Sequence, residues 1–204
     1  MKVVTLARKK RAAQQPALSE RFVKALGYAA RLHARQTRKK TNRPYIGHLL
    51  GVASIVIEYG GDEEMAIAAL LHDAVEDQGG LPRLSEIRRK FGARVARIVD
   101  GCTDAYSDPK PPWRARKLAY IHRVAHESAD VRLVSAADKL SNARETLAEL
   151  RLHGHRVFKK FAGKKKGTLW YYRTLIMTFQ AAGRHPLVEE LDRVVAELEA
   201  LART

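Results

Sequence analysis

The chain has 204 residues, of which 46% are hydrophobic and 29% charged, and its 38 Lys and Arg residues against 22 Asp and Glu give a net charge of +16. This length allows one domain with its own core, and the longest apolar runs fall short of the roughly 20 residues that a membrane span needs. The single cysteine, Cys102, excludes an internal disulfide and is typical of a reducing compartment, so we expect a cytoplasmic protein. The positive charge favours polyanionic partners, either nucleic acid or a phosphorylated small molecule.

Residues 1–17 are predicted to form a basic tail, because they carry Lys and Arg but lack the apolar centre and cleavage site of a secretory signal. Residues 18–204 are predicted to form one all-α domain, since apolar side chains recur at three- and four-residue steps and strand signals are almost absent. The predicted helices are 18–32, one that begins near 47, 65–75, a short piece from 85, 93–99, 114–126, 131–150, 169–182 and 186–201. The predicted loops are 37–45, 104–112 and 159–167.

The central predicted helix, 65–75, is too rich in Ala and Leu to face water, yet charged residues cluster at its end. Burying such groups is costly unless something compensates them, and a bound cation is the natural compensation. On a helix, His72 and Glu76 share one face. Asp73 and Asp77 share the adjacent face. All four side chains are therefore expected to point toward the mouth of one pocket.

Two further segments each place a potential metal ligand within an apolar helical pattern. His48 lies at the start of the second predicted helix, and Asp138 lies within 131–150. One buried histidine is more often a hydrogen-bonded core residue than a ligand, but three separated elements with an imidazole or a carboxylate are harder to explain by packing. Together with His72 and Asp73 they predict a site of two imidazoles and two carboxylates for one divalent ion, a donor set that suits manganese, iron or zinc.

The order of His48, His72-Asp73 and Asp138 resembles the pattern of the HD-domain superfamily of metal-dependent phosphohydrolases, which are helical bundles. More narrowly, the chain resembles the small alarmone hydrolases, the stand-alone hydrolase branch of the Rel/Spo-homologue superfamily. The pair Glu76-Asp77 is the most discriminating feature, because many other HD phosphohydrolases lack it. The segments that carry the resemblance lie between about residues 22 and 180: Arg38-Lys39, Pro44-Tyr-Ile-Gly-His48, Ala68–Asp77, Phe91-Gly92, Thr103-Asp104 and Ala137–Asn142.

This resemblance implies that the protein removes pyrophosphate from the 3′ position of guanosine tetra- or pentaphosphate, usually with Mn²⁺, to give GDP or GTP. The ion would orient a water molecule and polarise the 3′-diphosphate. Glu76 and Asp77 are then expected to position and deprotonate this water, because a carboxylate one helical turn beyond the ligands can reach it without binding the ion. The length leaves no room for a synthetase domain, so we expect the chain to degrade alarmones and not to make them.

Four residues match positions at which the family contacts its nucleotide. Arg38 and Lys39 match the pair that clasps the guanine ring, where a guanidinium can stack on a purine. Asn142 matches a ribose or phosphate contact, and Tyr171 matches a further nucleotide contact. Thr37 departs from the pattern, because relatives often have a basic residue there, and this leaves the base preference open.

Two other functions fit the same residues. An HD-type phosphohydrolase of an adenosine analogue or a 3′-phosphorylated cofactor would keep the metal site and differ only in its base pocket. A non-catalytic basic RNA- or ribosome-binding protein would use the tail and Lys164-Lys-Lys166, but no nucleic-acid motif is present and the His-Asp ligands would be unexplained. A small polyphosphorylated nucleotide is therefore favoured over nucleic acid as partner, and oligomer formation stays open. The remaining histidines are assigned to packing or surface positions: His33, His122, His126, His153, His155 and His185.

Overall fold

The computed structural model describes residues 18–38, 42–106 and 109–203 of the chain. The predicted tail, 1–17, and the candidate residue Lys39 lie outside the described residues. The helices, in chain order, are α1 (Glu20–Leu32), α2 (Ile46–Glu58), α3 (Glu63–Leu71), α4 (Ala74–Asp77), α5 (Gly80–Phe91), α6 (Ala93–Cys102), α7 (Trp113–Ala125), α8 (Ala129–His153), the 3₁₀ helix η1 (Gly154–Lys160), α9 (Lys164–Ala181) and α10 (Pro186–Arg203).

Helices account for nearly all the regular structure. The described residues contain ten α-helices, one 3₁₀ helix and one isolated β-bridge, between Thr37 and Pro44. The predicted all-α class is confirmed. Within the same residues, no helix combines the length and the apolar character that crossing a membrane requires.

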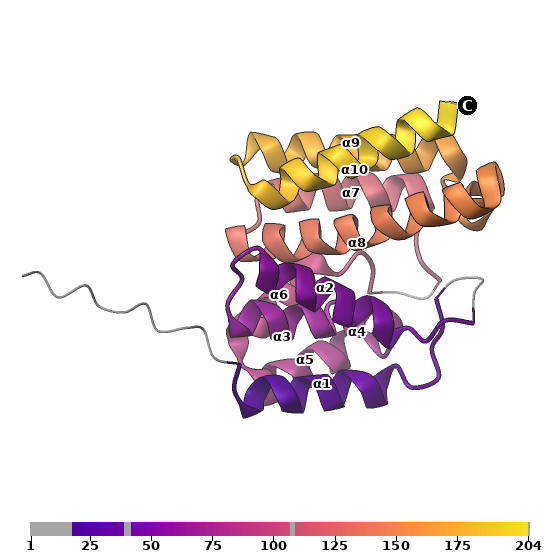
Figure 1. Cartoon of the computed structure of the whole chain (residues 1–204). Coiled ribbons are helices and arrows are strands. Elements are labelled where there is room, and N and C mark those ends of the chain that lie inside the picture. The colour runs from indigo at the N-terminus through magenta and orange to yellow at the C-terminus, as the bar shows by residue number, and fades with distance from the viewer. Residues whose placement is uncertain (1–17, 39–41, 107–108, 204) are drawn as a thin grey trace, which may run out of the picture.

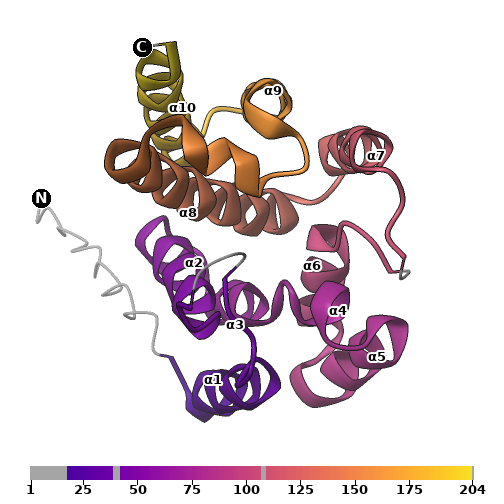
Figure 2. The same cartoon turned by 90° about the vertical axis from the view of Figure 1, so that its right-hand side faces the viewer.

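The long helix α8 lies at the centre of the molecule (Figures 1 and 2). Helices α1 to α6 gather on one side of it, and α7, α9 and α10 lie on the other. Helix α8 packs directly against α2, α3 and α6 and also against α10 and η1. A side chain on the part of α8 that packs against α2 can therefore contact side chains of both α2 and α3.

Helix α3 is deeply buried, and all residues from Ala66 to Leu71 are inaccessible to solvent. Its start is capped by Asp62, whose carboxylate accepts the Met65 N–H at 3.0 Å, and Glu63 adds negative charge at the positive end of the helix dipole. Small alanine side chains let α3 approach its neighbours closely. His72, which directly follows α3, therefore lies in the interior.

The predicted helix 65–75 is divided in the structure. Helix α3 ends at Leu71, and His72 and Asp73 form a turn before α4. The Asp77 N–H then donates to the Asp73 carbonyl at 3.0 Å. The backbone of His72 and Asp73 stays in the right-handed helical region, and the two side chains nevertheless approach each other, with His72 Nε2 3.0 Å from Asp73 Oδ2. The prediction of a continuous helix is wrong here, because an apolar pattern does not report where the hydrogen-bond ladder is interrupted.

The predicted loop 159–167 is also partly wrong, since η1 covers its beginning and α9 starts at Lys164. A Cβ atom at Gly163 would lie 2.6 Å from the Trp113 ring, and one at Gly167 would lie 3.1 Å from it. The two glycines therefore let the start of α9 pack closely on Trp113. This tertiary contact outweighs the basic composition that suggested a loop.

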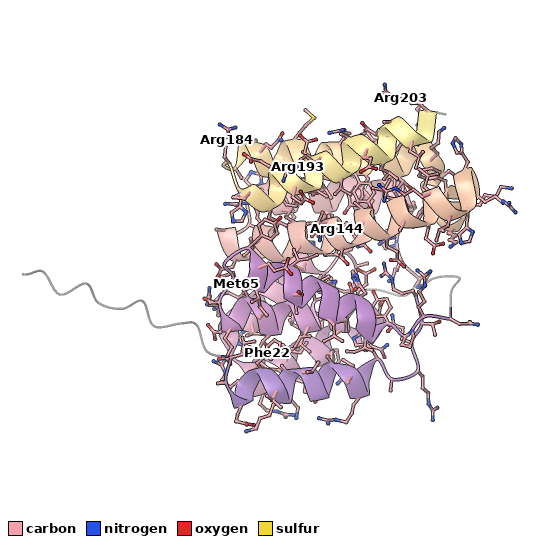
Figure 3. The ribbon with its side chains drawn as sticks, in the orientation of Figure 1. Phe22, Met65, Arg144, Arg184, Arg193 and Arg203 are labelled. Atoms are coloured by element: carbon pink, nitrogen blue, oxygen red, sulfur yellow. The ribbon has the colours of Figure 1, made fainter. Side chains whose placement is uncertain are left out.

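Helix α10 covers the outer side of α8. Leu191 and Val195 are fully buried in this contact, and Arg144 of α8 donates to Glu190 of α10 at 3.0 Å (Figure 3). Arg193 donates to the same carboxylate at 2.7 Å. Exposed ion pairs of this kind contribute little to stability, so the apolar contact holds α10 in place.

Candidate metal centre and catalytic residues

Four predicted ligands come together in the interior. His48 lies on α2, His72 and Asp73 lie in the turn between α3 and α4, and Asp138 lies on α8. The His48 Nε2 atom is 3.2 Å from Asp138 Oδ1 and 3.7 Å from Asp73 Oδ2. The His72 Nε2 atom is 3.0 Å from Asp73 Oδ2 and 3.6 Å from Asp138 Oδ1. The ligand atoms of the two histidines and Asp138 all lie within 4.8 Å of one another, which is close enough for one ion.

Hydrogen bonds at the second ring nitrogen orient both imidazoles. The His72 Nδ1 atom is 2.8 Å from the Ala69 carbonyl oxygen, which can only accept, so Nδ1 carries the proton. The His48 Nδ1 atom is 3.2 Å from Ser141 Oγ. Both rings therefore turn Nε2 toward the carboxylates, as a metal-binding neutral imidazole does.

The polar groups of this cluster fit a divalent cation. The His72 side chain is 2% exposed, and Nε2 forms no hydrogen bond within the described residues, since the geometry of its approach to Asp73 is not that of one. Burial alone would lower the pKa of His72, yet the carboxylates of Asp73 and Asp138 raise it well above its ordinary value. Burial would raise the pKa of Asp138, but Lys139 and the two imidazoles lower it. A buried and a partly buried carboxylate beside an imidazole nitrogen without a hydrogen-bond partner in the described residues form the donor set of a divalent metal site.

Tyr45 is a part of this centre that the sequence analysis did not name as a site residue. Its hydroxyl donates to Asp73 Oδ2 at 2.5 Å. Its ring contacts the His33 ring, with 5.4 Å between centroids, and the Arg38 guanidinium lies 5.5 Å from its centroid. Burial and the Asp73 charge both raise the pKa of Tyr45, so the hydroxyl keeps its proton. The Pro44-Tyr45 entry to α2 was visible in the sequence, but a contact across 28 positions was not.

The two carboxylates predicted to act on water, Glu76 and Asp77, lie on α4 beside basic side chains. The Lys110 ammonium donates to Glu76 Oε1 at 2.7 Å and lies 3.6 Å from Asp77 Oδ1. The Arg116 guanidinium is 3.6 Å from the same Glu76 oxygen, and the Asp104 N–H donates to the other at 3.3 Å. The chain between α6 and the first turns of α7 thus supplies partners of Glu76 and one cation near Asp77, whereas the Gln36 amide donates to Asp77 Oδ2 at 2.8 Å.

A buried group of cations near Glu76 was not predicted. Arg116 and Lys117 of α7 both pair with Asp104, whose side chain is 7% exposed, and Lys139 pairs with Asp138. Within the described residues, Asp104 Oδ1 and Arg116 Nε form no hydrogen bond. The only sequence signal was Thr103-Asp104, which lies in a segment that carries the family resemblance. These cations place positive charge beside the candidate catalytic pair.

Arg38 and Asn142, two of the predicted nucleotide contacts, meet next to Asp138, a predicted metal ligand. The Arg38 guanidinium donates to Asn142 Oδ1 at 2.7 Å and to Glu145 at 3.0 Å. The Asn142 amide donates to Asp138 Oδ1 at 2.5 Å. Burial would lower the pKa of Arg38, but the pair with Glu145 raises it. A hydrogen-bonded path therefore runs from Arg38 to the metal centre.

Tyr171, the remaining predicted nucleotide contact, lies on α9 in a different environment. Its side chain is buried, and its hydroxyl has no hydrogen-bond partner in the described part of the chain. The Lys117 ammonium is 4.8 Å from the ring centroid. Tyr171 therefore lies beside the cations of α7. Within the described residues it forms no hydrogen bond with Arg38 or Asn142.

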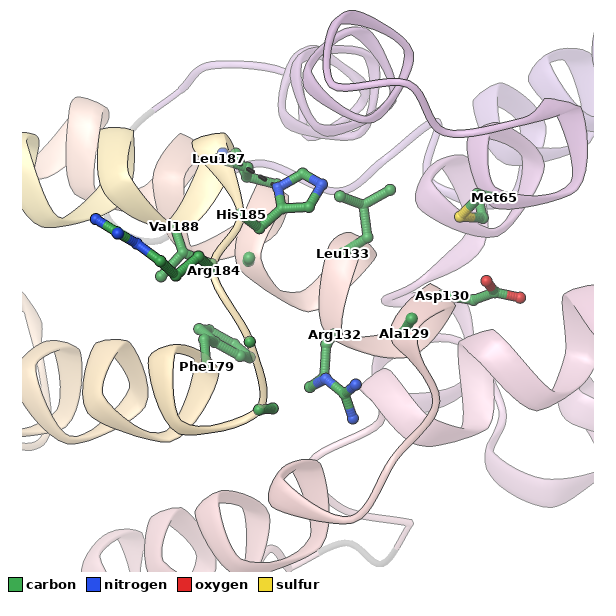
Figure 4. A pocket seen from close by; sticks show the side chains of 13 residues that line it. Met65, Ala129, Asp130, Arg132, Leu133, Phe179, Arg184, His185, Leu187 and Val188 are labelled. Carbon is green, nitrogen blue, oxygen red and sulfur yellow. Dashed lines mark hydrogen bonds between the residues drawn. The ribbon is translucent and has the colours of Figure 1, made fainter.

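A cavity of about 270 Å³ lies elsewhere, where the first turns of α8 meet the end of α9 and the start of α10 (Figure 4). Leu133, Phe179 and Leu187 contribute apolar walls, and no predicted site residue lines it. Arg132 already donates to a neighbouring backbone carbonyl, and His185 Nδ1 already accepts the Leu187 N–H. This cavity therefore lies apart from the predicted site residues.

Comparison with known proteins gives one family. The model of the HD domain family matches residues 25–169, which is most of the chain. The human guanosine-3′,5′-bis(diphosphate) 3′-pyrophosphohydrolase MESH1 is 39% identical over 127 residues, which cover 61% of this chain and 68% of the human protein. The MESH1 protein of Xenopus tropicalis is 40% identical over the same length.

A solved structure agrees with these relatives. It is described as a metazoan orthologue of SpoT that hydrolyses ppGpp, and it aligns with a TM-score of 0.72 and 27% sequence identity. The alignment covers 91% of this chain and 98% of that one. Together with the buried His, His-Asp and Asp cluster, these matches show that the chain belongs to the HD-domain family and is a relative of the MESH1 pyrophosphohydrolases.

Proposed function

We propose that this protein is a metal-dependent hydrolase that removes the 3′-pyrophosphate from guanosine 3′,5′-bis(diphosphate) and its pentaphosphate analogue. The observation that carries the proposal is the position of Glu76 and Asp77, directly after the ligands His72 and Asp73 and among basic side chains. A water held by an ion in the cluster would lie within reach of these carboxylates. The names of relatives that share 39–40% identity support the same reaction.

His48, His72, Asp73 and Asp138 would hold one divalent ion, which we propose to be Mn²⁺. Two imidazole nitrogens and two carboxylate oxygens form a donor set of intermediate softness that leaves positions open for water and substrate. When bound, the ion supplies Lewis acidity and lowers the pKa of a coordinated water. The Tyr45 hydroxyl fixes the orientation of Asp73 from outside the ligand set.

Glu76 and Asp77 position the attacking water and take its proton. Lys110 and Arg116 place positive charge beside these carboxylates, where a diphosphate brought close to them adds negative charge. Cations fixed in a partly buried site stabilise such charge more strongly than cations in water do. The chain thus supplies both the proton acceptor and the compensation for the phosphate charge.

The nucleoside end of the substrate is proposed to bind at Arg38 and Asn142. The Arg38 guanidinium offers a planar surface on which guanine can stack, and Asn142, which bridges Arg38 to Asp138, lies where a ribose or phosphate oxygen would reach the site. Lys39 and Tyr171 are proposed as further nucleotide contacts on the family resemblance. The buried Tyr171 hydroxyl without a partner supports a polar contact there.

The test is to incubate the purified protein with guanosine tetraphosphate and Mn²⁺ and to resolve the products by ion exchange. We expect pyrophosphate and GDP from wild type, no product from Asp73→Ala, and normal product from Asp192→Ala, whose carboxylate pairs with Arg173 at the surface. Wild type that releases no pyrophosphate, or release that survives Asp73→Ala, would reject the proposal. Turnover of an adenosine analogue alone, or salt-sensitive RNA binding without turnover, would reject the guanosine substrate.

A further inference from the structure

Gln36 lies between the end of α1 and the entry to α2, and its backbone is held on both sides. Its N–H donates to the His33 carbonyl at 3.0 Å, and its carbonyl accepts the Tyr45 N–H at 2.9 Å. The bridge between Thr37 and Pro44 adjoins these bonds. The backbone hydrogen bond between Gln36 and Tyr45 therefore links the position of Gln36 to that of Tyr45, whose hydroxyl donates to Asp73.

Three hydrogen bonds set the orientation of the Gln36 side-chain amide. Its Oε1 atom accepts from Gln78 Nε2 at 2.6 Å and lies 2.7 Å from His33 Nδ1. Its Nε2 atom donates to Asp77 Oδ2 at 2.8 Å. A flipped amide would set its NH₂ group against the Gln78 NH₂ and its oxygen against the Asp77 carboxylate, so only one orientation satisfies all partners.

His33 anchors this arrangement from the interior. Its residue exposure is 2%, and its ring contacts the Tyr45 ring at 5.4 Å between centroids. Burial lowers the pKa of His33, so at neutral pH the ring is neutral, and the bond to Gln36 Oε1 places its proton on Nδ1. His33, predicted from the sequence to be a packing or surface residue, thus contacts the amide that donates to Asp77.

Within the described residues, the other oxygen of Asp77 has no hydrogen bond comparable to the one from Gln36. Lys110 lies 3.6 Å from Asp77 Oδ1, beyond a short hydrogen bond, and its ammonium donates instead to Glu76 at 2.7 Å. One quarter of the Asp77 side chain is exposed. Without the Gln36 amide, the carboxylate would be free to turn toward the Lys110 ammonium or toward solvent.

We propose that Gln36 is a positioning residue for the reaction: its amide fixes the direction in which the Asp77 carboxylate meets the attacking water. The inference rests on the proposed function, since it requires Asp77 to act on that water. Gln36 itself need not touch the nucleotide or the ion. Its loss should therefore slow the chemical step and leave the binding of both unchanged.

The experiment compares Gln36→Leu and Gln36→Glu with wild type, with Gln180→Leu on the exposed side of α9 as the matched control. We expect Gln36→Leu to lower kcat by about 10- to 100-fold, the equivalent of one hydrogen bond to a charged group. The KM for guanosine tetraphosphate and the Mn²⁺ affinity, measured by titration calorimetry, should change by less than about threefold. Gln180→Leu should match wild type in all three.

Gln36→Glu separates a positioning role from a structural one. It keeps an oxygen acceptor for His33 and Gln78 but sets a second carboxylate against Asp77. A structural role predicts that Glu restores activity, whereas our proposal predicts a kcat at least as low as that of Gln36→Leu. Restored activity in Gln36→Glu, an unchanged kcat in Gln36→Leu, or a change confined to KM would overturn the role of Gln36 and leave the proposed function standing. Wild type that releases no pyrophosphate would overturn both.

Discussion

Helix α8 takes part in two clusters of charged side chains that differ in how their polar atoms are satisfied. Near its first turn, Arg94 of α6 pairs with Asp130 at 2.8 Å, Asp62 at 2.6 Å and Glu64 at 3.1 Å. These four side chains are 29–49% exposed. Farther along α8, the ligand cluster around Asp138 lies in the interior.

In that second cluster His48, His72 and Asp138 have side chains 2–11% exposed, and Asp73 is 21% exposed. Each carboxylate of the Arg94 cluster already meets a cation, whereas His72 Nε2 has no hydrogen-bond partner in the described residues. The carboxylates of Asp73 and Asp138 have donors in Tyr45, Asn142 and Lys139, whereas the buried His72 nitrogen lacks a partner that a further group, such as an ion, would supply. The comparison teaches that incomplete pairing, rather than the number of charges, marks the functional cluster.

The largest expected loss of activity is that of a variant without one of the proposed metal ligands. We expect Asp138→Asn to lower kcat to below about one thousandth of wild type, equivalent to about 4 kcal/mol, and to abolish Mn²⁺ binding seen by electron paramagnetic resonance. The exposed carboxylate of Asp192 provides the control, and Asp192→Asn should bind Mn²⁺ normally. Retention of a tenth of the activity by Asp138→Asn would show that Asp138 is not a ligand.

Tyr45→Phe should have the next largest effect, because it removes the hydrogen bond to Asp73 and keeps the ring in place. Loss of an outer partner of a metal ligand costs about 10- to 100-fold in metal affinity or activity. We expect a loss in this range, measured as kcat at several Mn²⁺ concentrations. Tyr59→Phe removes a hydroxyl at the end of α2 and should leave both quantities unchanged. Equal activity of the two variants would contradict the role of Tyr45.

Arg94→Met tests the exposed cluster, where we expect an effect on stability alone. Three partly exposed ion pairs together contribute about 1–2 kcal/mol, so the free energy of unfolding in urea should fall by that amount. Enzymatic kcat should stay within about twofold of wild type, because the pairs lie away from the ligands. A kcat that falls while the variant remains folded would show that the two clusters are coupled.

The smallest expected effect is that of Asp62→Asn. Burial alone would raise the pKa of Asp62, but donation from Arg94 and the Met65 N–H lowers it. Since the unfolded chain binds the proton more readily, the stability from this charge is present above about pH 4 and is lost as pH falls through the folded pKa. Asn still caps α3, so the variant should lose less than about 1 kcal/mol at pH 7.

The contribution of the Asp62 charge is tested through the pH dependence of the free energy of unfolding. Unfolding free energies measured in urea at pH 7, 5, 4 and 3 should decline less steeply for Asp62→Asn than for wild type. Asp130→Asn, which removes another partner of Arg94 without affecting a cap acceptor, is the matched comparison. Parallel curves for Asp62→Asn and wild type would mean that the Asp62 charge contributes nothing to the fold.

Much of the fold could be predicted because the spacing of apolar residues that indicates a helix is visible within short segments of the sequence. The helices that carry His48 and Asp138 lie where the apolar pattern placed them. The break after Leu71 could not be predicted, because the apolar pattern continues through it to Val75. The helical start at Lys164 could not be predicted either, because it depends on the Trp113 ring.

The partners of the site depend on contacts between distant segments. Tyr45 reaches Asp73, Gln36 reaches Asp77, and Lys110 reaches Glu76. No periodicity relates these positions, since the contacts form only after the segment before α2 and the segment between α6 and α7 have packed beside α4 and the turn that precedes it. The sequence therefore indicated candidate ligands and candidate catalytic residues, but not the side chains that contact them.

By itself the sequence determined the all-α class and the residue types of a metal centre, because helical periodicity and the cost of burying charge are properties of short segments. Only the tertiary structure decided that His48, His72 and Asp138 share one site, since α2, α3 and α8 must pack together to bring them within 4.8 Å. It also decided which polar atoms find partners within the fold and which are left for an ion. Which polar atoms find partners depends on distances between side chains of different helices, and these distances cannot be read from the order of residues along the chain.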